Sequence, residues 1–482
     1  MHDISYRTLM RRDEFKYLLM MCAGVWIFAS DRLMETTLLP DITREIGGAN
    51  LISWGRTLFE AAAIVTGMLA AFLVRRWGVR FSFVTCGILF VFGCVVSAVA
   101  ENMLVFQIGR FFQALAGSAF VSLTSIGITQ MFPAILLARA GSIVAIVWGF
   151  AAFSGPLVGG LFSEYASWRS AFIYMSIFGS ALSVSSFFVL GRQPILASPQ
   201  TEDKAEPFPS LRMLVLIAGV MSIASGGISF SPVLTPALAL IGIALLVVFI
   251  LLDRAANDRR LLPTGVLKLN TKIGAAAYHV LALSASVVGI SLLGPILMVV
   301  LYDLPPIQIG YMMFTTSLGW TLGEMVFSGT QPEREGRVIV AGAVLVLLAV
   351  IAFNLALYSS LTWFYTLGFF VEGIGLGMSW SLIARRAIAD NNMLEKGRIA
   401  GSIHTLQRIG FSLGAASFGI LANAQGFSET MSVATAFEIT QWILGLSVPL
   451  AIAGLAAATV FAGARFNPMI DYAVEPVAPS SG

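Results

Sequence analysis

The sequence is poor in charged residues, although it is long. Only 11% of its 482 residues are Asp, Glu, Lys or Arg, and 57% are apolar. A soluble globular protein carries about 25% charged residues, so this chain has too few to cover a folded surface with polar groups. The composition excludes a cytosolic enzyme, a nucleic-acid-binding protein and a disordered scaffold. It predicts an integral membrane protein.

Cysteine and histidine are equally scarce, at three residues each. Cys22, Cys86 and Cys94 all lie in apolar runs, so we interpret them as small buried hydrophobic residues rather than disulfide partners or metal ligands. The sequence also lacks a P-loop, an HExxH motif and a GxSxG motif. We therefore expect no metal, no cofactor, no enzymatic activity and no direct use of ATP.

Long apolar runs occupy most of the chain. A bilayer core about 30 Å thick needs about 20 apolar residues in a helix. Runs of this kind predict fourteen membrane-spanning helices, at 17–40, 54–74, 81–100, 103–131, 140–162, 170–190, 213–230, 233–252, 273–302, 307–328, 338–358, 363–384, 399–423 and 442–464.

The positive residues give this arrangement an orientation. The predicted outer loops contain only Arg44 and Arg169, whereas most of the 29 Lys and Arg residues fall in the loops of the opposite side. Cytoplasmic loops carry the excess of Lys and Arg, so we expect both termini to be cytoplasmic and the protein to lie in the cell inner membrane. The predicted units are an N-terminal six-helix bundle at 1–192, a cytoplasmic linker at 193–210, a peripheral two-helix insert at 211–253, a cytoplasmic loop at 254–272, a C-terminal six-helix bundle at 273–466 and a cytoplasmic tail at 467–482.

Several stretches resemble the major facilitator superfamily, in particular its fourteen-helix drug:proton antiporter branch. The stretches that carry the resemblance are DRLMETTLLPDI at 31–42, GRFFQALAG at 109–117, GPLVGG at 155–160, GIGLG at 373–377 and LQRIGFSLGAA at 406–416. The resemblance implies an all-α fold of two pseudo-symmetric six-helix bundles in a 6+2+6 arrangement. It further implies that the bundles rock around a site near the middle of the membrane.

Two motifs of this resemblance concern packing and gating. Small residues in GPLVGG let a helix approach its neighbour closely, so Gly155, Pro156, Gly159 and Gly160 are expected to form a pivot or seal between the halves. The family's loop motif Asp-Arg-x-Gly-Arg occurs here as RRWGVR at 75–80 and is repeated as EREGR at 333–337. Its residues are Arg76, Gly78, Arg80, Arg334, Gly336 and Arg337.

The first copy of the loop motif departs from the family pattern. Arg75 stands where the family has an acidic residue, and that acid is thought to help close the cytoplasmic side. The replacement leaves the direction of transport open.

Ionisable residues inside a membrane span are costly unless they are paired or hydrated, so each is a functional candidate. At a rise of 1.5 Å per residue, Asp31 lies about 13 Å from the outer end of its helix, Glu60 about 9 Å and Arg110 about 10 Å. Asp31 and Glu35 share a helical face, whereas Arg32 points away from it. We predict that Asp31 exchanges a proton, with Arg110 as its partner. A fixed structural ion pair is the alternative.

Two further acidic residues, Glu60 and Glu372, lie inside predicted spans. Glu60 has Arg56 four residues earlier on the same helix, which favours a simple local pair. Glu372 has no cation within four residues and is a second proton or substrate carboxylate, with a pair to Arg408 as the alternative. The complete set comprises the proton-coupling candidates Asp31, Glu35 and Glu372 and the substrate-cavity candidates Arg32, Glu60, Arg110, Gln113, His404 and Arg408.

These observations predict a proton-coupled secondary transporter, functional as a monomer, for a small amphipathic or aromatic organic solute. Drug:proton antiport is what the family resemblance implies. Uptake of a small planar nutrient such as riboflavin is the first alternative, and a sensor or assembly subunit that transports nothing is the second. We expect no nucleic-acid partner.

Overall fold

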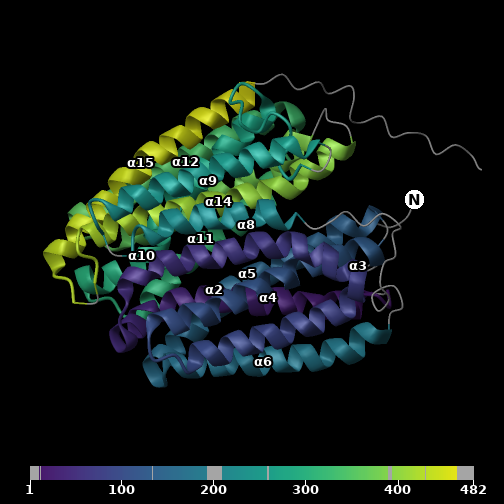
Figure 1. The fold of residues 1–482 in the computed structure, drawn as a ribbon, viewed down its shortest axis with the longest axis horizontal. Helices are drawn as coiled ribbons and strands as arrows, with labels where there is room; N and C mark the ends of the chain where they lie inside the picture. Colours follow the sequence, from purple (N-terminus) through teal and green to yellow (C-terminus); the bar gives the residue numbers. More distant parts are fainter. Residues whose placement is uncertain are drawn as a thin grey trace, which may run out of the picture.

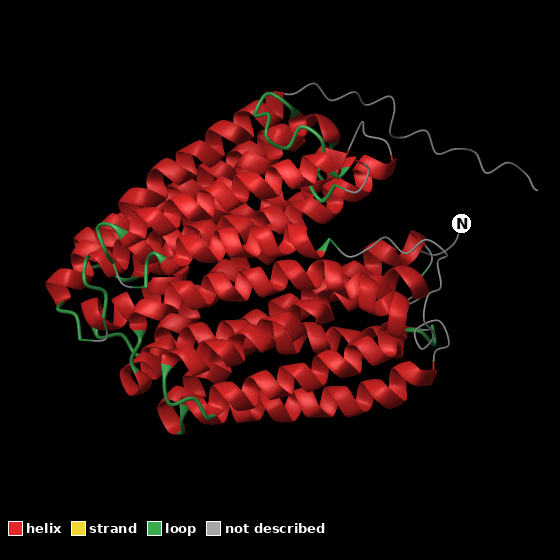
Figure 2. Ribbon diagram, viewed as in Figure 1, coloured by secondary structure: helices red, strands yellow, loops and turns green. Residues whose placement is uncertain are grey.

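The computed structural model describes residues 10, 12–132, 134–192, 209–228, 230–257, 260–388, 393–428 and 430–463. These residues are helical or lie in loops, and none of them forms a strand (Figure 2). The predicted all-α fold is therefore confirmed. Most of the predicted linker at 193–210 and all of the predicted tail at 467–482 lie outside the described residues.

Fifteen helical elements follow one another along the described part of the chain. They are α2 Phe15–Ile46, η1 Ala49–Leu51, α3 Ile52–Ala98, α4 Met103–Met131, α5 Ala134–Tyr165, α6 Trp168–Val189, η2 Leu190–Arg192, α8 Ser210–Ser225, α9 Leu234–Ala255, α10 Lys272–Tyr302, α11 Pro306–Phe327, α12 Pro332–Ser359, α13 Trp363–Ile388, α14 Met393–Ala424 and α15 Val433–Gly463.

Helix α3 contains two of the predicted spans, 54–74 and 81–100. Its helical geometry breaks at Gly78, which has φ 75° and ψ 170°. A residue with a side chain is strained at such a positive φ, whereas glycine is not, so the glycine of the loop motif is what allows the chain to reverse here.

Ten helical segments of the described residues are long and apolar enough to cross a membrane. They include α9 and most of the long helices of both halves, while α8 is a shorter apolar helix of 16 residues. The predicted spans at 54–74, 213–230, 307–328 and 399–423 lie outside these ten segments. The number of fourteen therefore stays a prediction.

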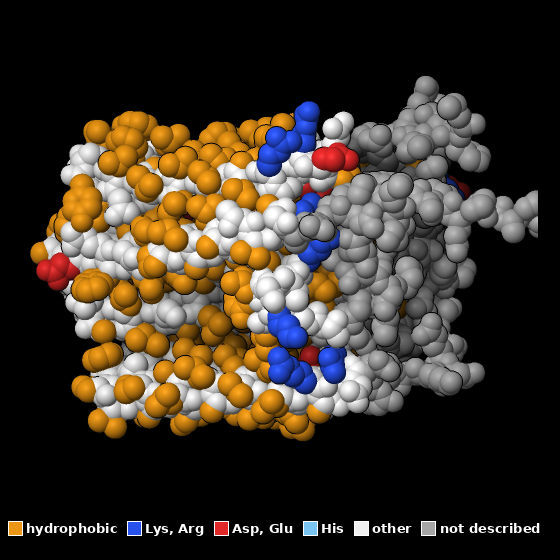
Figure 3. Space-filling view, turned by 90° about the horizontal axis from the view of Figure 1, so that it is seen from above, with side chains coloured by type: hydrophobic (Ala, Val, Ile, Leu, Met, Phe, Trp, Pro, Cys, Tyr) orange, Lys and Arg blue, Asp and Glu red, His pale blue; other side chains and the backbone are white. Residues whose placement is uncertain are grey.

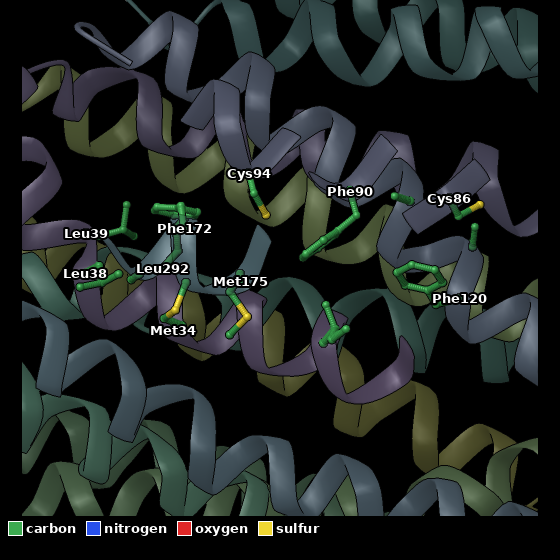
Figure 4. Close-up of a cluster of buried hydrophobic side chains, with 14 of the residues drawn as sticks. Met34, Leu38, Leu39, Cys86, Phe90, Cys94, Phe120, Phe172, Met175 and Leu292 are labelled. Carbon is green, nitrogen blue, oxygen red and sulfur yellow. The ribbon is translucent and has the colours of Figure 1, made fainter. Parts of the chain in front are cut away.

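The helices form two halves that lie side by side. Figure 1 shows α2–α6 in the lower half and α10–α15 in the upper half, with α8 between them. The core of the first half is apolar: Figure 4 shows Met34 and Leu38 of α2 beside Cys94 of α3 and Phe172 of α6. Leu292 of α10 joins this cluster, so the two halves share part of one core.

The long sides of the molecule are apolar. Hydrophobic side chains cover the face shown in Figure 3, and Lys and Arg side chains gather towards one end of it. Helix α9 illustrates the pattern, because Leu240, Ile243 and Leu251 are all exposed. An exposed apolar surface of this kind suits contact with lipid chains. The chain is a multi-pass membrane protein.

The halves meet at one end of the bundle, which we call the outer end and define by the loops at 47–51, 303–305 and 425–432. On the α3–α14 seam, Asn423 Nδ2 donates to the backbone oxygen of Asn50 over 2.8 Å, and Gly419 packs on Ser53. Nearer the middle, Thr57 Oγ1 donates to the backbone oxygen of Ser412 over 3.4 Å.

The α5–α11 seam is closed at the same end. Gly160 packs against Ile307, and Gly310 packs against Pro156. Towards the opposite end the side chain of Thr321, also on α11, is exposed. These contacts thus hold the two halves together at the outer end.

Helix α8 lies across the α3–α14 seam rather than at the periphery. Asn50 Nδ2 donates to the backbone oxygen of Ile228 over 2.7 Å, and Asn423 Nδ2 donates to that of Gly227 over 2.6 Å. Trp54 Nε1 donates to Ser225 Oγ over 3.1 Å. The loop that follows α8 therefore contacts both halves where they meet. The sequence predicts that α8 and α9 are both peripheral, but in the structure only α9 is.

Candidate functional site

The first group of buried charges is centred on Arg110 of α4. Its Nη1 donates to Asp31 Oδ2 over 2.7 Å and its Nη2 donates to Glu35 Oε2 over 2.8 Å, so one guanidinium holds two carboxylates of α2. Only 1% of the Arg110 side chain is exposed. Such a desolvated group is stable only because opposite charges contact it. The predicted pairing of Asp31 with Arg110 is present, and we call these three residues the acidic triad.

The surroundings of the acidic triad fix Arg110 in place. Arg110 Nη1 also donates to Gln113 Oε1, and Gln113 Nε2 donates to Ser97 Oγ over 3.0 Å. The guanidinium carbon lies 5.3 Å from the ring centre of Phe59, a distance suited to a cation–π contact. Asp31 Oδ1, by contrast, is buried and has no hydrogen-bond partner in the described structure. That oxygen is available to bind a proton.

The second group of charges is centred on Glu60 of α3. Glu60 Oε1 lies 2.9 Å from Arg56 Nη2 and 3.3 Å from Arg32 Nη2. Glu60 Oε2 accepts from Arg408 Nη1 over 3.1 Å, and the Glu60 side chain is completely buried. We call these four residues the arginine cluster.

The arginine cluster bears on two predictions from the sequence, namely the local pair of Arg56 with Glu60 and the partner of Arg408. The local pair between Arg56 and Glu60 exists, but two further arginines contact the same carboxylate. Arg408 pairs with Glu60, which lies in the other half of the molecule. The alternative ion pair, between Arg408 and Glu372, does not form among the described residues. Because α3 and α14 belong to different halves, the ion pair between Glu60 and Arg408 crosses the seam.

Glu372 of α13 is isolated from both groups. Its side chain is buried, and its Oε2 has no hydrogen-bond partner among the described residues. The neighbouring Gly373 packs on the backbone of Thr316 in α11, where a methyl group would collide with that backbone. The glycines of the GIGLG stretch thus bring α11 close to α13 beside this carboxyl. A carboxyl group without a charged partner is suited to carry a proton.

Aromatic side chains lie beside the arginine cluster. The ring of Trp380 lies 5.1 Å from that of His404, and 5.8 Å from that of Trp320. The guanidinium carbon of Arg32 lies 6.0 Å from the ring centre of Phe411. The side chain of His404 is exposed although it belongs to α14, which packs in the bundle, so solvent reaches this region.

The GPLVGG motif of α5 contacts both halves. Gly155 and Gly159 pack on the backbone of α2 at Ser30 and Met34, while Gly160 faces Ile307 of α11. Each contact is so close that an added Cβ would come within 3 Å of a neighbouring atom. The motif therefore lies where a packing or sealing element was predicted.

The two loop motifs differ in structure. In the first, Arg76 is exposed and the guanidinium carbon of Arg80 lies 4.1 Å from the ring centre of Phe187. The side chain of Arg75 lies outside the described residues. In the second, Arg334 and Arg337 are exposed, and Gly336 packs on the backbone of α15. Glu335 of this motif is buried and accepts from Arg385 Nε over 2.6 Å.

Comparison with known proteins decides the family. Residues 21–415 match the Major Facilitator Superfamily. The chain belongs to the major facilitator superfamily. The predicted family and fold class are confirmed, and the protein is a transporter of the superfamily.

Relatives of similar length support the same assignment. A probable multidrug-efflux transporter of Mycobacterium tuberculosis is 25% identical over 433 residues, which is 87% of this chain and 90% of that protein. An uncharacterized transporter of the superfamily from Bacillus subtilis, YcnB, is 24% identical over 85% of this chain and 87% of its own.

Solved structures share the fold of this superfamily member. A bacterial homologue of the human lysosomal transporter Spinster, in an inward-facing and unoccupied conformation, superposes with a TM-score of 0.68 at 13% identity over 94% of this chain and 98% of that one. A D-xylose–proton symporter superposes with a TM-score of 0.62 at 13% identity over the same shares of the two chains. Transporters of the superfamily are generally carriers without enzymatic activity.

Proposed function

We propose that the protein is a proton-coupled secondary transporter that moves a small amphipathic or aromatic organic solute across the cell inner membrane. The acidic triad carries this proposal. Asp31 is buried, is held by Arg110 through one oxygen and has a second oxygen without a partner. Buried ion pairs contribute little to stability compared with apolar packing, so a triad in a membrane span is better explained by function.

Protonation of Asp31 would change how α2 is held. In the observed state Arg110 attracts two carboxylates of α2. A proton on Asp31 removes one of these attractions and leaves Glu35 as the remaining counterion of Arg110. Because Arg32 follows Asp31 directly and contacts Glu60, a movement of α2 at the proton site also alters the arginine cluster. This connection gives a path from protonation to the solute.

The relatives and the loops support export as the direction of transport. The curated relatives named as probable multidrug-efflux transporters favour export by exchange for protons. The sparse Lys and Arg of the outer loops favour cytoplasmic termini, and the contacts described above then hold the halves together on the outer side. Rocking of the bundles at 1–192 and 273–466 about the central charges would expose them to the other side.

Uptake of a planar nutrient remains the second candidate function, because Arg75 replaces the acid of the loop motif. The two functions are separated by flux measurements on purified protein in liposomes. An imposed pH gradient should drive solute accumulation opposite to the proton flow for antiport and in the same direction for symport. A complete lack of solute-dependent proton movement, over a panel of drugs and vitamins, would contradict both and favour a sensor.

A further inference from the structure

In the described structure, the side chains joined by ion pairs between α2, α3, α4 and α14 have charges that do not cancel. These ion pairs involve three acidic residues, Asp31, Glu35 and Glu60. They also involve four arginines, Arg32, Arg56, Arg110 and Arg408. When all are ionised, one positive charge is left over. An uncompensated charge in the middle of a membrane protein is costly, so a further anion at this place would be stabilising.

The excess is located in the arginine cluster. In the acidic triad two carboxylates face one guanidinium, whereas in the arginine cluster one carboxylate faces three. Arg32 and Arg408 each donate one recorded hydrogen bond, to Glu60, although a guanidinium has five N–H groups. Arg56 Nε is buried and has no hydrogen-bond partner in the described structure. Donors for a second anion are therefore present.

The cluster is also accessible. The side chains of Arg32 and Arg408 each retain 22% of their exposure, in contrast to the buried Glu60 between them. His404, one turn from Arg408, is exposed and contacts Trp380. A ligand that reaches these exposed side chains would meet two guanidinium groups and aromatic rings together. Arginine binds planar oxyanions through paired hydrogen bonds, and its face stacks on aromatic rings.

We propose that the arginine cluster binds the carboxylate or phosphate group of an aromatic organic anion, and that Glu60 holds one of the arginines for this anion, Arg408, in the present conformation. The inference names the solute class of the proposed transporter and rests on that proposed function. The incoming anion competes with Glu60 for Arg408. Since the pair between Glu60 and Arg408 crosses the α3–α14 seam, its replacement loosens the innermost contact of that seam and favours opening of the outer end.

Binding is tested by thermal shift of the purified full chain in detergent, because a ligand that binds the folded state stabilises it. N-acetyltryptophan, its amide and tryptamine form one probe set with charges of −1, 0 and +1 on the same ring. Phenyl phosphate, phenol and benzylamine form the set for the phosphate source. The proposal predicts that the anion of at least one set raises the melting temperature more than its neutral and cationic partners. Equal shifts within both sets, or a larger shift with the cations, would overturn it.

Three variants localise the effect. Arg408→Gln should weaken binding of the stabilising anion by about tenfold or more, because it removes charge-assisted hydrogen bonds. Glu60→Gln should tighten anion binding, because the competing carboxylate is lost. Arg212→Gln is the matched control, since Arg212 forms an ion pair with Asp253 between α8 and α9 and should leave the response unchanged.

The outcomes also separate this inference from the proposed function. If Glu60→Gln only lowers stability and leaves anion affinity unchanged, Glu60 is a structural counterion and the inference is wrong. If pH-driven flux occurs with cations while no anion binds, the transporter proposal stands without this solute class. If anions bind as predicted but no solute crosses the liposome membrane, the anion site stands and the transport proposal fails.

Discussion

Arg110 shows how a single residue connects charge to stability. It is the counterion of both Asp31 and Glu35, and the three side chains have little or no contact with solvent. Removing one partner of a buried ion pair leaves an uncompensated charge, which costs about 3–5 kcal/mol. A substitution in the acidic triad is therefore expected to affect folding as well as function.

Substitution of Arg110 should affect both stability and transport. Arg110→Ala is expected to lower the free energy of unfolding by about 3–5 kcal/mol and to abolish gradient-driven transport. Arg110→Lys keeps the charge but lacks the forked guanidinium, so it should be intermediate in both. Arg44→Ala is the control, since it removes an exposed pair with Asp41 that is worth about 1 kcal/mol at most. Stable Arg110→Ala protein with normal transport would show that the triad is dispensable.

The residues of the acidic triad could be predicted from the sequence, whereas the arginine cluster could not. A charged residue in an apolar run is conspicuous by itself, and matching depths in the membrane suggested that Asp31 and Arg110 meet. The spacing of Arg56 and Glu60 indicated a pair on one helix. That Arg32 and Arg408 reach the same carboxylate depends on how the two halves face each other, and no local pattern contains this information.

At the scale of elements, the outer seal depends on close approach of helices. Gly160 of α5 lies against Ile307, and a Cβ at Gly160 would come within 2.6 Å of the Ile307 side chain. The α3–α14 seam is held in parallel by Asn423 and by the loop after α8. Small changes in helix spacing should therefore shift the balance between closed and open outer ends.

The substitution Gly160→Ala should favour opening of the outer end. Ser53 is buried against Gly419 in the observed state, so a cysteine introduced by Ser53→Cys should react slowly with a membrane-impermeant maleimide added outside. Adding Gly160→Ala should accelerate this labelling, because the new methyl group separates α5 from α11. Gly445→Ala on α15 is the matched control, since nothing lies within 4 Å of a Cβ there. Equal labelling rates in the two backgrounds would contradict the proposed seal.

Sequence patterns predicted the helical elements well and the role of α8 poorly. The loop motif at 75–80 lies between two predicted spans, and the positive φ of Gly78 shows why a glycine stands there. The sequence predicts that α8 belongs to a peripheral insert because its apolar run lies between the two predicted six-helix bundles. Its position across the α3–α14 seam depends on hydrogen bonds from Asn50 and Asn423 to backbone oxygens at 227–228, contacts that have no sequence signature.

At the scale of the whole molecule, a few polar contacts near the centre join the two halves. The contacts at the outer end hold the halves together there, and the pair between Glu60 and Arg408 crosses the same α3–α14 seam. The acidic triad and the arginine cluster are adjacent through Asp31 and Arg32 of α2. Binding of a proton at the first and of a solute at the second would thus act on the same helix, which is the requirement for coupled transport.

The most direct test of this coupling is a comparison of accumulation with exchange in liposomes containing the Asp31→Asn variant. Without a titratable group at position 31, an imposed pH gradient should no longer drive accumulation, whereas exchange of labelled for unlabelled solute should persist. Asp41→Asn, the same change at the outer end of α2, should leave both activities intact. Normal gradient-driven accumulation by Asp31→Asn would contradict the central claim that Asp31 carries the coupled proton.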